Sequence, residues 1–490
     1  MNKFHKLFGK EFHYWIILAI TTLIAIFYFA LNVNSWKFTN VGDDWAFYEF
    51  ARNIVRDGFS INPLGLSGVY GTNPVLGSFY QAIFLKIFGL NNFAWRLSNV
   101  VLIIPVSLFF FLWLKENFNA RVGLIGTIFL QSSFYLANYF KIGYVNPLSF
   151  TFFIASLYFA ARLTKEGSIN SLVALAVLLG LSFYVYIGPL FILFLLPYFF
   201  MIQRRVTRSV FIKYIIVFMS IFTYLLLPVF SNRDYLQKAF EQTSIHKQFQ
   251  DNSQILVNVF NNFFLFFRNN DYLNNHFIAG PYLDIVTGAL FLIGILWCIA
   301  NCKKNKYLLL LSLYITLAIT IGLTSPYSYS PATRGIFFIP FGVAFAAVGF
   351  DLVFKKLGEN KFLYLVFLLI FSINLYKSQI EVFQMTGYTG ADLIVKEFQD
   401  IKIANNPRKI ILVASSPPFD YQDFYVKYQA YGFKNIFELL KPGDIGCKKI
   451  SHAEVMYFGS DTSSVDALSA LRCYPKDFFT KKLDPAFSTF

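Results

Sequence analysis

The chain has 490 residues, of which 56% are hydrophobic, 20% aromatic and only 14% charged. Apolar runs long enough to cross a bilayer recur along it, which excludes a soluble globular protein and indicates an integral membrane protein. A formal net charge of +15 would suggest nucleic-acid binding in a soluble protein. Here much of the Lys and Arg lies in short links between apolar runs, so membrane topology explains the charge and no nucleic-acid partner is expected.

The first apolar run, residues 14–33, follows Lys3, Lys6 and Lys10. It is too long for the apolar core of a cleaved signal peptide, so we interpret it as a signal anchor and the first span. Windows of about 20 residues predict about eleven spans along the chain. The predicted spans are residues 14–33, 96–114, 121–139, 146–162, 170–186, 188–203, 210–230, 282–301, 307–324, 335–353 and 361–377.

The basic residues of the links predict the orientation of these spans. If the N-terminus is cytoplasmic, every cytoplasmic link contains Lys or Arg, for example Arg204 and Arg205, or Lys303 and Lys304. An excess of Lys and Arg in cytoplasmic loops is typical of membrane proteins. We therefore predict a multi-pass protein of the plasma (inner) membrane with its N-terminus inside and its C-terminus outside, in contact with membrane lipids.

This orientation places three large pieces outside: residues 34–95 in the first outer loop, residues 231–281 in the fourth, and the tail from residue 378. Apolar helical patterns predict interfacial helices in both loops. Two lie in the first loop and end at Gly58 and Gly89, and the third has the sequence SQILVNVFNNFFLFF. Residues 1–377 are thus predicted to form a transmembrane domain of helices only, and residues 378–490 a separate extracytoplasmic domain.

The tail differs from the rest of the chain in composition. KIILVASSPP (409–418) and AEVMYFG (453–459) each carry an apolar run typical of a strand, with polar turns between them. These patterns predict a small α+β domain. Cys447 and Cys473 lie in it, and an extracytoplasmic location would allow a disulfide between them; two free thiols are the alternative.

Two adjacent carboxylates, Asp43 and Asp44, open an amphipathic helical stretch a few residues after the first span, GDDWAFYEFAR (42–52). A carboxylate at the membrane surface can act as a general base or hold a cation. Aspartate at a helix N-terminus also caps backbone N–H groups and offsets the helix dipole. The residues alone leave both roles open; they give no metal-binding site, and a divalent metal requirement stays open.

The stretch from Gly42 to Pro63 resembles the first outer loop of the GT-C glycosyltransferases, specifically the group of the protein O-mannosyltransferases and aminoarabinose transferases (glycosyltransferase family 39). In that group an acidic pair is followed by an aromatic residue and then by Ala-Arg. Asp43 matches the family's catalytic Asp and Asp44 its acidic neighbour. Phe47 stands where Tyr is usual, and Ala51-Arg52 matches the Ala-Arg.

Two further segments carry the resemblance. FAWRLSNVV (93–101) is similar to the family's Arg-Leu-Pro-Ser segment at the start of the second span, with Ser98 where Pro is common. SPYSYSPATRGIFFIPFGVAFAAVG (325–349) is similar to the late segment in which an outer-face Arg precedes a span that contains a Pro. The long fourth outer loop and the tail also fit, so the resemblance implies the GT-C fold.

The resemblance implies a reaction as well: transfer of a sugar, with inversion at the anomeric carbon, from a polyprenyl-phosphate-linked donor to a lipid, glycan or protein acceptor on the extracytoplasmic side. In that mechanism Asp43 is the general base on the acceptor. Cationic side chains stabilise the departing lipid phosphate. The sequence accordingly has no convincing nucleotide-binding Gly-rich loop.

Three cations at predicted outer membrane edges are candidates for binding the lipid phosphate: Arg96, Lys141 and Arg334. Each could instead extend to phosphates of the bulk membrane. Aromatic side chains that could contact the sugar or acceptor are found in both resembling loops, although interfacial anchoring explains such residues equally well. These aromatic candidates are Phe47, Tyr48, Tyr327 and Tyr329.

Other functions remain as alternatives to a membrane glycosyltransferase. A transporter or flippase for lipid-linked saccharides would need ionisable residues deep in its spans, and these spans are nearly free of them. A polymerase or ligase for lipid-linked saccharides would also have basic outer loops, but it would not need the carboxylate pair after the first span. A purely structural membrane subunit is the last alternative.

Overall fold

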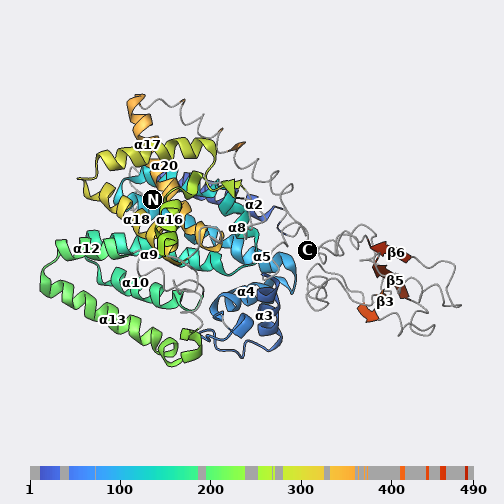
Figure 1. Ribbon diagram of the computed structural model, residues 1–490. Helices are drawn as coiled ribbons and strands as arrows, with labels where there is room; N and C mark the ends of the chain where they lie inside the picture. Colours follow the sequence, from blue (N-terminus) through green and yellow to red (C-terminus); the bar gives the residue numbers. More distant parts are fainter. Residues whose placement is uncertain are drawn as a thin grey trace, which may run out of the picture.

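The computed structural model describes a helical body and a C-terminal sheet that lies beyond one end of it (Figure 1). The described residues are 12–31, 33, 44–71, 73–185, 195–237, 252–267, 269–270, 280–324, 332–358, the single positions 362, 369, 372 and 373, and the C-terminal strands 409–413, 437–440, 453–458 and 480–483.

The helices of the body follow one another with short links, as expected for apolar segments separated by polar ones. In chain order they are α2 (Phe12–Ala30), α3 (Asp44–Arg56), α4 (Leu76–Phe88), α5 (Asn92–Val101), α6 (Ile103–Asn117), α7 (Ala120–Gln131), α8 (Phe134–Lys141), α9 (Asn146–Glu166), α10 (Ile169–Ser182), α12 (Leu196–Arg205), α13 (Arg208–Ser231), α16 (Asn252–Phe263), α17 (Ile285–Ala300), α18 (Asn305–Thr324), α19 (Ala332–Gly335) and α20 (Ile339–Lys356). The 3-10 turns η3 (Val69–Gly71), η4 (Leu265–Phe267) and η6 (Ile336–Phe338) complete this part.

In the described residues, six helical stretches are long and apolar enough to cross a membrane. They are Phe12–Ala30, Asn92–Asn117, Asn146–Glu166, Arg208–Ser231, Asn305–Leu323 and Ile336–Lys356, and four shorter apolar helices accompany them: Leu76–Phe88, Ala120–Gln131, Ile169–Ser182 and Ile285–Ala300. The protein is an integral membrane protein of mainly helical fold, as the sequence predicted. Most of the predicted span at 361–377 lies outside the described residues, and the predicted count of eleven remains a prediction.

The segment predicted as one span over residues 121–139 differs from that prediction. The structure divides it into α7 and α8 at Ser132 and Ser133. The Ser132 hydroxyl donates to the Phe129 carbonyl, and the Ser133 hydroxyl accepts the Leu136 N–H and caps α8. Serine side chains compete with the helix for backbone partners, which explains the break within an apolar run.

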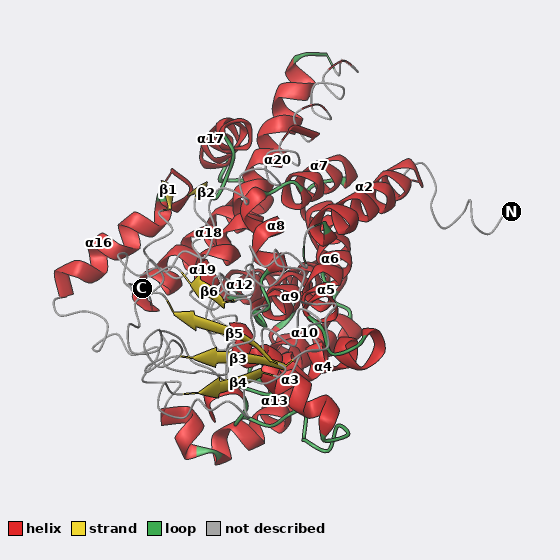
Figure 2. Ribbon diagram, turned by 90° about the vertical axis from the view of Figure 1, so that its right-hand side faces the viewer, coloured by secondary structure: helices red, strands yellow, loops and turns green. Residues whose placement is uncertain are grey.

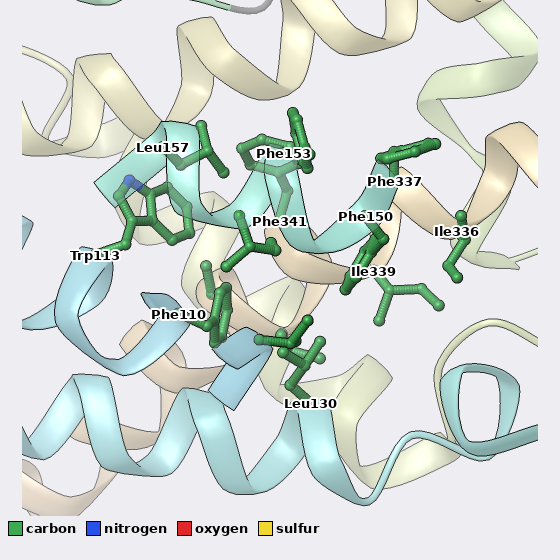
Figure 3. Packing of buried hydrophobic residues seen from close by; sticks show 14 of the residues in the cluster. Phe110, Trp113, Leu130, Phe150, Phe153, Leu157, Ile336, Phe337, Ile339 and Phe341 are labelled. Atoms are coloured by element: carbon green, nitrogen blue, oxygen red, sulfur yellow. The ribbon is translucent and has the colours of Figure 1, made fainter. Parts of the chain in front are cut away.

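Aromatic side chains fill the centre of the body. The spans that include α9 and α20 are the most enclosed, with 83% of the window buried in each, compared with 17% for α13. The Phe153 ring of α9 lies 5.3 Å from that of Phe337 and 6.1 Å from that of Phe341. Trp113 of α6 meets Phe341 edge-on, with the ring centres 5.9 Å apart. Figure 3 shows these side chains in the core. This packing joins the second predicted span to the late segment singled out in the sequence.

Small residues let α17 and α20 approach closely. A Cβ atom added at Gly294 of α17 would overlap the backbone of Phe345, and one at Gly349 of α20 would overlap the backbone of Leu290. Membrane helices associate through small residues in this way, because lipid provides no hydrophobic drive for helix pairing.

The loops predicted to lie outside meet at one end of the body, which we call the α3 end. Arg96 Nη1 on α5 donates to the carbonyl oxygen of Lys141, the last residue of α8, at 2.8 Å. The ring of Phe47 on α3 lies 5.3 Å from that of Tyr144, in the link that follows α8. Phe337 of η6 packs against the first turns of α9.

Links predicted to be cytoplasmic meet at the other end, which we call the α12 end. Lys165 of α9 pairs with Glu116 of α6 at 2.7 Å. Arg121 of α7 lies 3.6 Å from Asp351 of α20. Arg205 at the end of α12 donates to the carbonyl of residue 164 in the last turn of α9, at 3.1 Å. The separation of the two sets agrees with the predicted alternation of the links.

The third predicted interfacial helix is present as α16. It packs on α18, where the Asn258 side chain donates to the Gly322 carbonyl. A Cβ at Gly322 would crowd Val259, so the two helices need a glycine at this position. Leu256, Val257 and Phe260 form its exposed apolar face, which suits a helix lying on a membrane surface.

Two sheets are described. Asn269–Asn270 (β1) and Gly280–Pro281 (β2) form a short antiparallel pair. The C-terminal strands β3 (Lys409–Val413), β4 (Phe437–Leu440), β5 (Ala453–Phe458) and β6 (Thr480–Leu483) form a parallel sheet in the order β4-β3-β5-β6. The predicted strands at 409–418 and 453–459 are confirmed as β3 and β5. The links between the strands, with Cys447 and Cys473, lie outside the described residues, so the α+β domain and its disulfide remain predictions.

Candidate active site

The helix α3 begins at Asp44, as the sequence predicted, and its buried face packs on α4 and α5. Tyr48, Ala51 and Ile54 recur at three-residue spacing along this face and are buried. The ring of Tyr48 lies 5.2 Å from that of Trp95 on α5. This contact fixes the position of the helix whose N-terminus carries the acidic pair.

The polar side chains of α3 are partly enclosed as well. Arg52 is 7% exposed and lies 3.7 Å from the carboxylate of Glu49, one turn earlier. Burial raises the pKa of the Tyr48 phenol to about 12, although the nearby charges of Arg52 and Arg56 oppose that rise. Tyr48 is therefore protonated at neutral pH and can serve as a hydrogen-bond donor, but not as a base.

The link between α8 and α9, residues 142–145, accepts three hydrogen bonds from side chains of α4 and α5. Gln81 Nε2 donates to the Gly143 carbonyl at 2.8 Å. Asn99 Nδ2 donates to the carbonyls of Ile142 and Tyr144, both at 2.7 Å. Trp95 Nε1 donates in turn to Gln81 Oε1 at 3.1 Å. Buried carbonyls need such partners, so these bonds define the path of the link.

Close packing reinforces this hydrogen-bond clamp. A Cβ atom at Gly143 would overlap the indole of Trp95, and one at Gly77 of α4 would crowd the side chain of Val145. Only glycine permits these approaches, so the link is held tightly against α4 and α5.

Lys141 and Arg96 form the cationic part of the α3 end. Both are fully buried. Arg96 Nε donates to Asn92 Oδ1 at 2.7 Å, and its Nη1 donates to the Lys141 carbonyl. Its guanidinium also lies 5.1 Å from the centre of the Trp95 ring, at cation–π distance. Arg96 thus fixes the backbone that carries Lys141.

Burial also changes the ionisation of Lys141. The amine lies at the end of α8, beyond the predicted span, and desolvation lowers its pKa to about 7. Burial therefore favours the neutral amine, and a neighbouring anion would favour the charged form.

Arg334 enters the same end of the body from the late segment. It lies in the short helix α19, directly before η6, which packs against α9. A Cβ at the next residue, Gly335, would overlap the phenol of Tyr282. The ring of Tyr282 lies 4.2 Å from that of Tyr135 on α8. Tyr282 therefore connects the segment that contains Arg334 to α8, and Lys141 is the last residue of α8.

The structure therefore brings together the predicted catalytic and substrate-binding residues that it describes. The backbone of Asp44 at the start of α3, together with Phe47, Tyr48, Arg96, Lys141 and Arg334, belongs to elements that meet at the α3 end. Phe47 and Tyr48 are buried by aromatic neighbours. Asp43, Tyr327 and Tyr329 lie outside the described residues. Figure 2 looks onto this end of the body, beyond which the sheet lies.

Sequence reasoning missed Gln81 and Asn99. Asn99 belongs to the quoted FAWRLSNVV segment, and Gln81 is a lone amide in the apolar helix LGSFYQAIFLKIF. A polar residue on a buried helix face signals a hydrogen-bond partner elsewhere. Within the described ranges, no cluster of three or more His, Cys, Asp or Glu could hold a metal ion.

Known proteins resemble this chain in part of its sequence and in its fold. Residues 72–230 match the family model described as dolichyl-phosphate-mannose-protein mannosyltransferase. The match includes α4 to α13 with the clamped link, and it begins after the acidic pair. Among curated proteins, none matches the sequence.

Two solved proteins share the fold over most of the chain. The crystal structure of ArnT from Cupriavidus metallidurans bound to undecaprenyl phosphate has a TM-score of 0.53 at 11% identity, and the likeness covers 96% of this chain and 89% of that one. The apo oligosaccharyltransferase from Archaeoglobus fulgidus has a TM-score of 0.53 at 13% identity, over 87% of this chain and 64% of that one. The chain thus spans less than two thirds of the archaeal enzyme's length.

A further structure shows the archaeal protein AglB from Archaeoglobus fulgidus in complex with an inhibitory peptide and a dolichol-phosphate, with a TM-score of 0.51 at 13% identity over 89% of this chain and 65% of that one. Together with the family match, these likenesses confirm the resemblance and the fold expected from the sequence.

Proposed function

We propose that this chain, which has the fold of the GT-C membrane glycosyltransferases, transfers a sugar from a polyprenyl-phosphate-linked donor to an acceptor on the extracytoplasmic side of the membrane. The observation that carries the proposal is the likeness to ArnT bound to undecaprenyl phosphate, which extends over 96% of the chain. The family match and the archaeal complex with dolichol-phosphate support the same class of donor.

The proposed reaction replaces one bond at the anomeric carbon by another. The acceptor loses a proton to the Asp43 carboxylate, its oxygen or nitrogen bonds to the anomeric carbon, and the bond from that carbon to the phosphate oxygen breaks. The electron pair leaves with the polyprenyl phosphate. Attack from the face opposite the leaving group inverts the configuration. Asp43 directly precedes α3, where the helix dipole favours the ionised carboxylate that a base requires.

Lys141 and Arg334 are proposed to bind the donor phosphate. Additional negative charge appears on that phosphate as the bond breaks, and cations fixed in a water-poor site stabilise it strongly. Arg96 contributes positive charge. Through its hydrogen bond to the Lys141 carbonyl it also positions Lys141. Phe47, Tyr48, Tyr327 and Tyr329 remain candidates for shaping the sugar and acceptor subsite.

The test is the variant Asp43→Asn, assayed in membranes that are supplied with a labelled polyprenyl-phosphate sugar. A general base contributes roughly 10²–10⁴-fold to rate, so we expect a loss of that size in kcat with donor binding retained. Asp57→Asn is the matched control, because Asp57 is an exposed carboxylate just beyond the other end of α3. Transfer by the Asp43 variant at more than a tenth of the wild-type rate would show that Asp43 is not the general base.

Sugar and acceptor can be identified together. Mass spectrometry of glycolipids and glycoproteins should show one glycoform that disappears when the gene is deleted and returns with the wild-type gene, but not with the Asp43→Asn gene. Movement of a labelled lipid-linked sugar across the membrane without any transfer product would support a flippase instead.

A further inference from the structure

A cavity of about 640 Å³ lies between α12 and α18, and Arg204, Arg205 and Asn305 line it at the α12 end of the body. In Figure 1 the label of α12 lies at the left of the body, whereas α3, α4 and α5 lie toward the sheet at the right. The proposed reaction does not use this cavity. Its volume is within the range of about 300–1,000 Å³ typical of ligand pockets.

The lining changes in polarity from one end of the cavity to the other. Arg204 and Arg205 in the last turn of α12 stand opposite Asn305, which begins α18. About eight residues back along α12, roughly 12 Å away at 1.5 Å per residue, the lining is formed by Leu196 and Pro197. On α18 the lining away from Asn305 includes Ser312 and Thr316, so the cavity has one cationic end and one uncharged, mainly apolar end.

The described residues of the lining do not offset the positive charge of the cationic end. Among the described residues that line the cavity, none is acidic. Arg205 is tied to α9 through its bond to the carbonyl of residue 164. Arg204 is exposed, so its guanidinium can contact a ligand at this end of the cavity. Phe200 and Leu308 leave large apolar areas exposed beside it.

We propose that this cavity binds an anionic phospholipid of the cytoplasmic leaflet, with the phosphate at Arg204 and Arg205 and an acyl chain along the apolar part. Charge complementarity favours an anionic head group, and the polarity gradient matches the head-to-tail order of a lipid that enters from the membrane. Basic pockets between membrane helices on the cytoplasmic side bind anionic lipid head groups. The orientation of this end follows from the basic links, and the proposal does not depend on the proposed transfer reaction.

The experiment is native mass spectrometry of the purified full chain in detergent, with equal amounts of phosphatidylglycerol and phosphatidylcholine that carry the same acyl chains. We expect the wild-type protein to retain phosphatidylglycerol preferentially. Loss of one arginine contact is worth about 1 kcal/mol, so Arg204→Gln should lower phosphatidylglycerol retention about fivefold. Arg208→Gln is the control, because Arg208 is an exposed arginine that begins α13 and does not line the cavity.

A second pair of variants tests the apolar part. Ser312 lines the cavity and donates to the carbonyl four residues earlier, and Ser220 makes the same bond on an exposed face of α13. Ser312→Phe should reduce lipid retention, whereas Ser220→Phe should not.

Four outcomes would overturn the proposal. They are equal retention of the two lipids, equal losses for Arg204→Gln and Arg208→Gln, unchanged retention in Ser312→Phe, and displacement of phosphatidylglycerol by a lower concentration of undecaprenyl phosphate. The last outcome would assign the cavity to the polyprenyl carrier.

Discussion

The two ends of the helical body hold their charges in different ways. At the α3 end, Arg96 and Lys141 are fully buried, and Arg96 donates to neutral oxygens. At the α12 end, the side chains of Lys165 and Lys355 are 58% and 56% exposed, and both pair with carboxylates. Burying a cation is costly, and strongly perturbed ionisable groups cluster at functional sites. The contrast supports a buried phosphate site at the α3 end, whereas the charges at the α12 end lie at an exposed surface.

The largest expected effect tests how tightly the α3 end is packed. Gly143→Ala would push a methyl group into Trp95, which bonds to Gln81. Overpacking of this kind costs about 1–3 kcal/mol, so we expect a clear fall in the Tm of the purified protein together with loss of transfer. The fall reflects strain around a link whose position the active site needs.

The matched control for this variant is Gly288→Ala in α17, where an added Cβ meets no atom within 4 Å. Alanine is a better helix former by about 1 kcal/mol, so its Tm should hold or rise. If the two glycine variants have the same Tm, the link at Gly143 is not tightly packed, and the proposed difference between the two ends is wrong.

A smaller effect concerns the ionisation of Lys141. With a pKa of about 7, its amine is charged below that pH and becomes neutral above it, while phosphate binding requires the charged form. Donor binding therefore takes up a proton above pH 7. Because the charged fraction of the amine falls with rising pH, we expect the donor KM of the wild-type enzyme to rise roughly 25-fold between pH 6.5 and 8.5.

Two variants separate the charge from other roles of this side chain. Lys141→Met should have a high KM that does not change with pH. Lys141→Arg keeps its charge throughout this range and should retain a lower KM with a flat pH profile. A wild-type KM that stays constant from pH 6.5 to 8.5 would remove Lys141 from phosphate binding.

The smallest effect is expected at the α12 end. Glu166→Gln removes the pair between Arg162 and Glu166, whose atoms lie 2.8 Å apart and whose side chains are 42% and 44% exposed. Exposed pairs one turn apart on a helix contribute about 0.3–0.5 kcal/mol. The Tm should shift by at most a degree or two and transfer should persist. A fall as large as that of Gly143→Ala would mean that this end is as tightly constrained as the other.

Local patterns predicted much of this molecule. Runs of apolar residues predicted the six stretches that are long and apolar enough to cross a membrane in the described residues, and amphipathic stretches predicted α3 and α16. These features depend on neighbours in sequence. Two C-terminal strands were found for the same reason. The other two were not: β4 is short, and β6, with the sequence TKKL, has little apolar character. Both pair with strands far away in sequence.

The candidate site was predicted unevenly. Asp43, Lys141 and Arg334 could be named because residue type, predicted topology and family resemblance converged on them. The supporting residues could not be named, since Gln81 and Gly143 are 62 positions apart, and Asn99 and Tyr144 are 45 apart. The local sequence around Gln81 or Asn99 does not indicate which backbone carbonyl its side-chain amide will bond to.

The sequence by itself determined that the chain is a membrane protein, and it predicted how the links alternate and which carboxylate and cations are candidates for the chemistry. These follow from hydropathy, charge and motif, which are properties of short segments. The tertiary structure decided that α7 and α8 are separate helices, that Arg96 holds the backbone beside Lys141, and that Gly143 fits against Trp95. Buried polar groups must find partners inside the protein, and only folding brings those partners together.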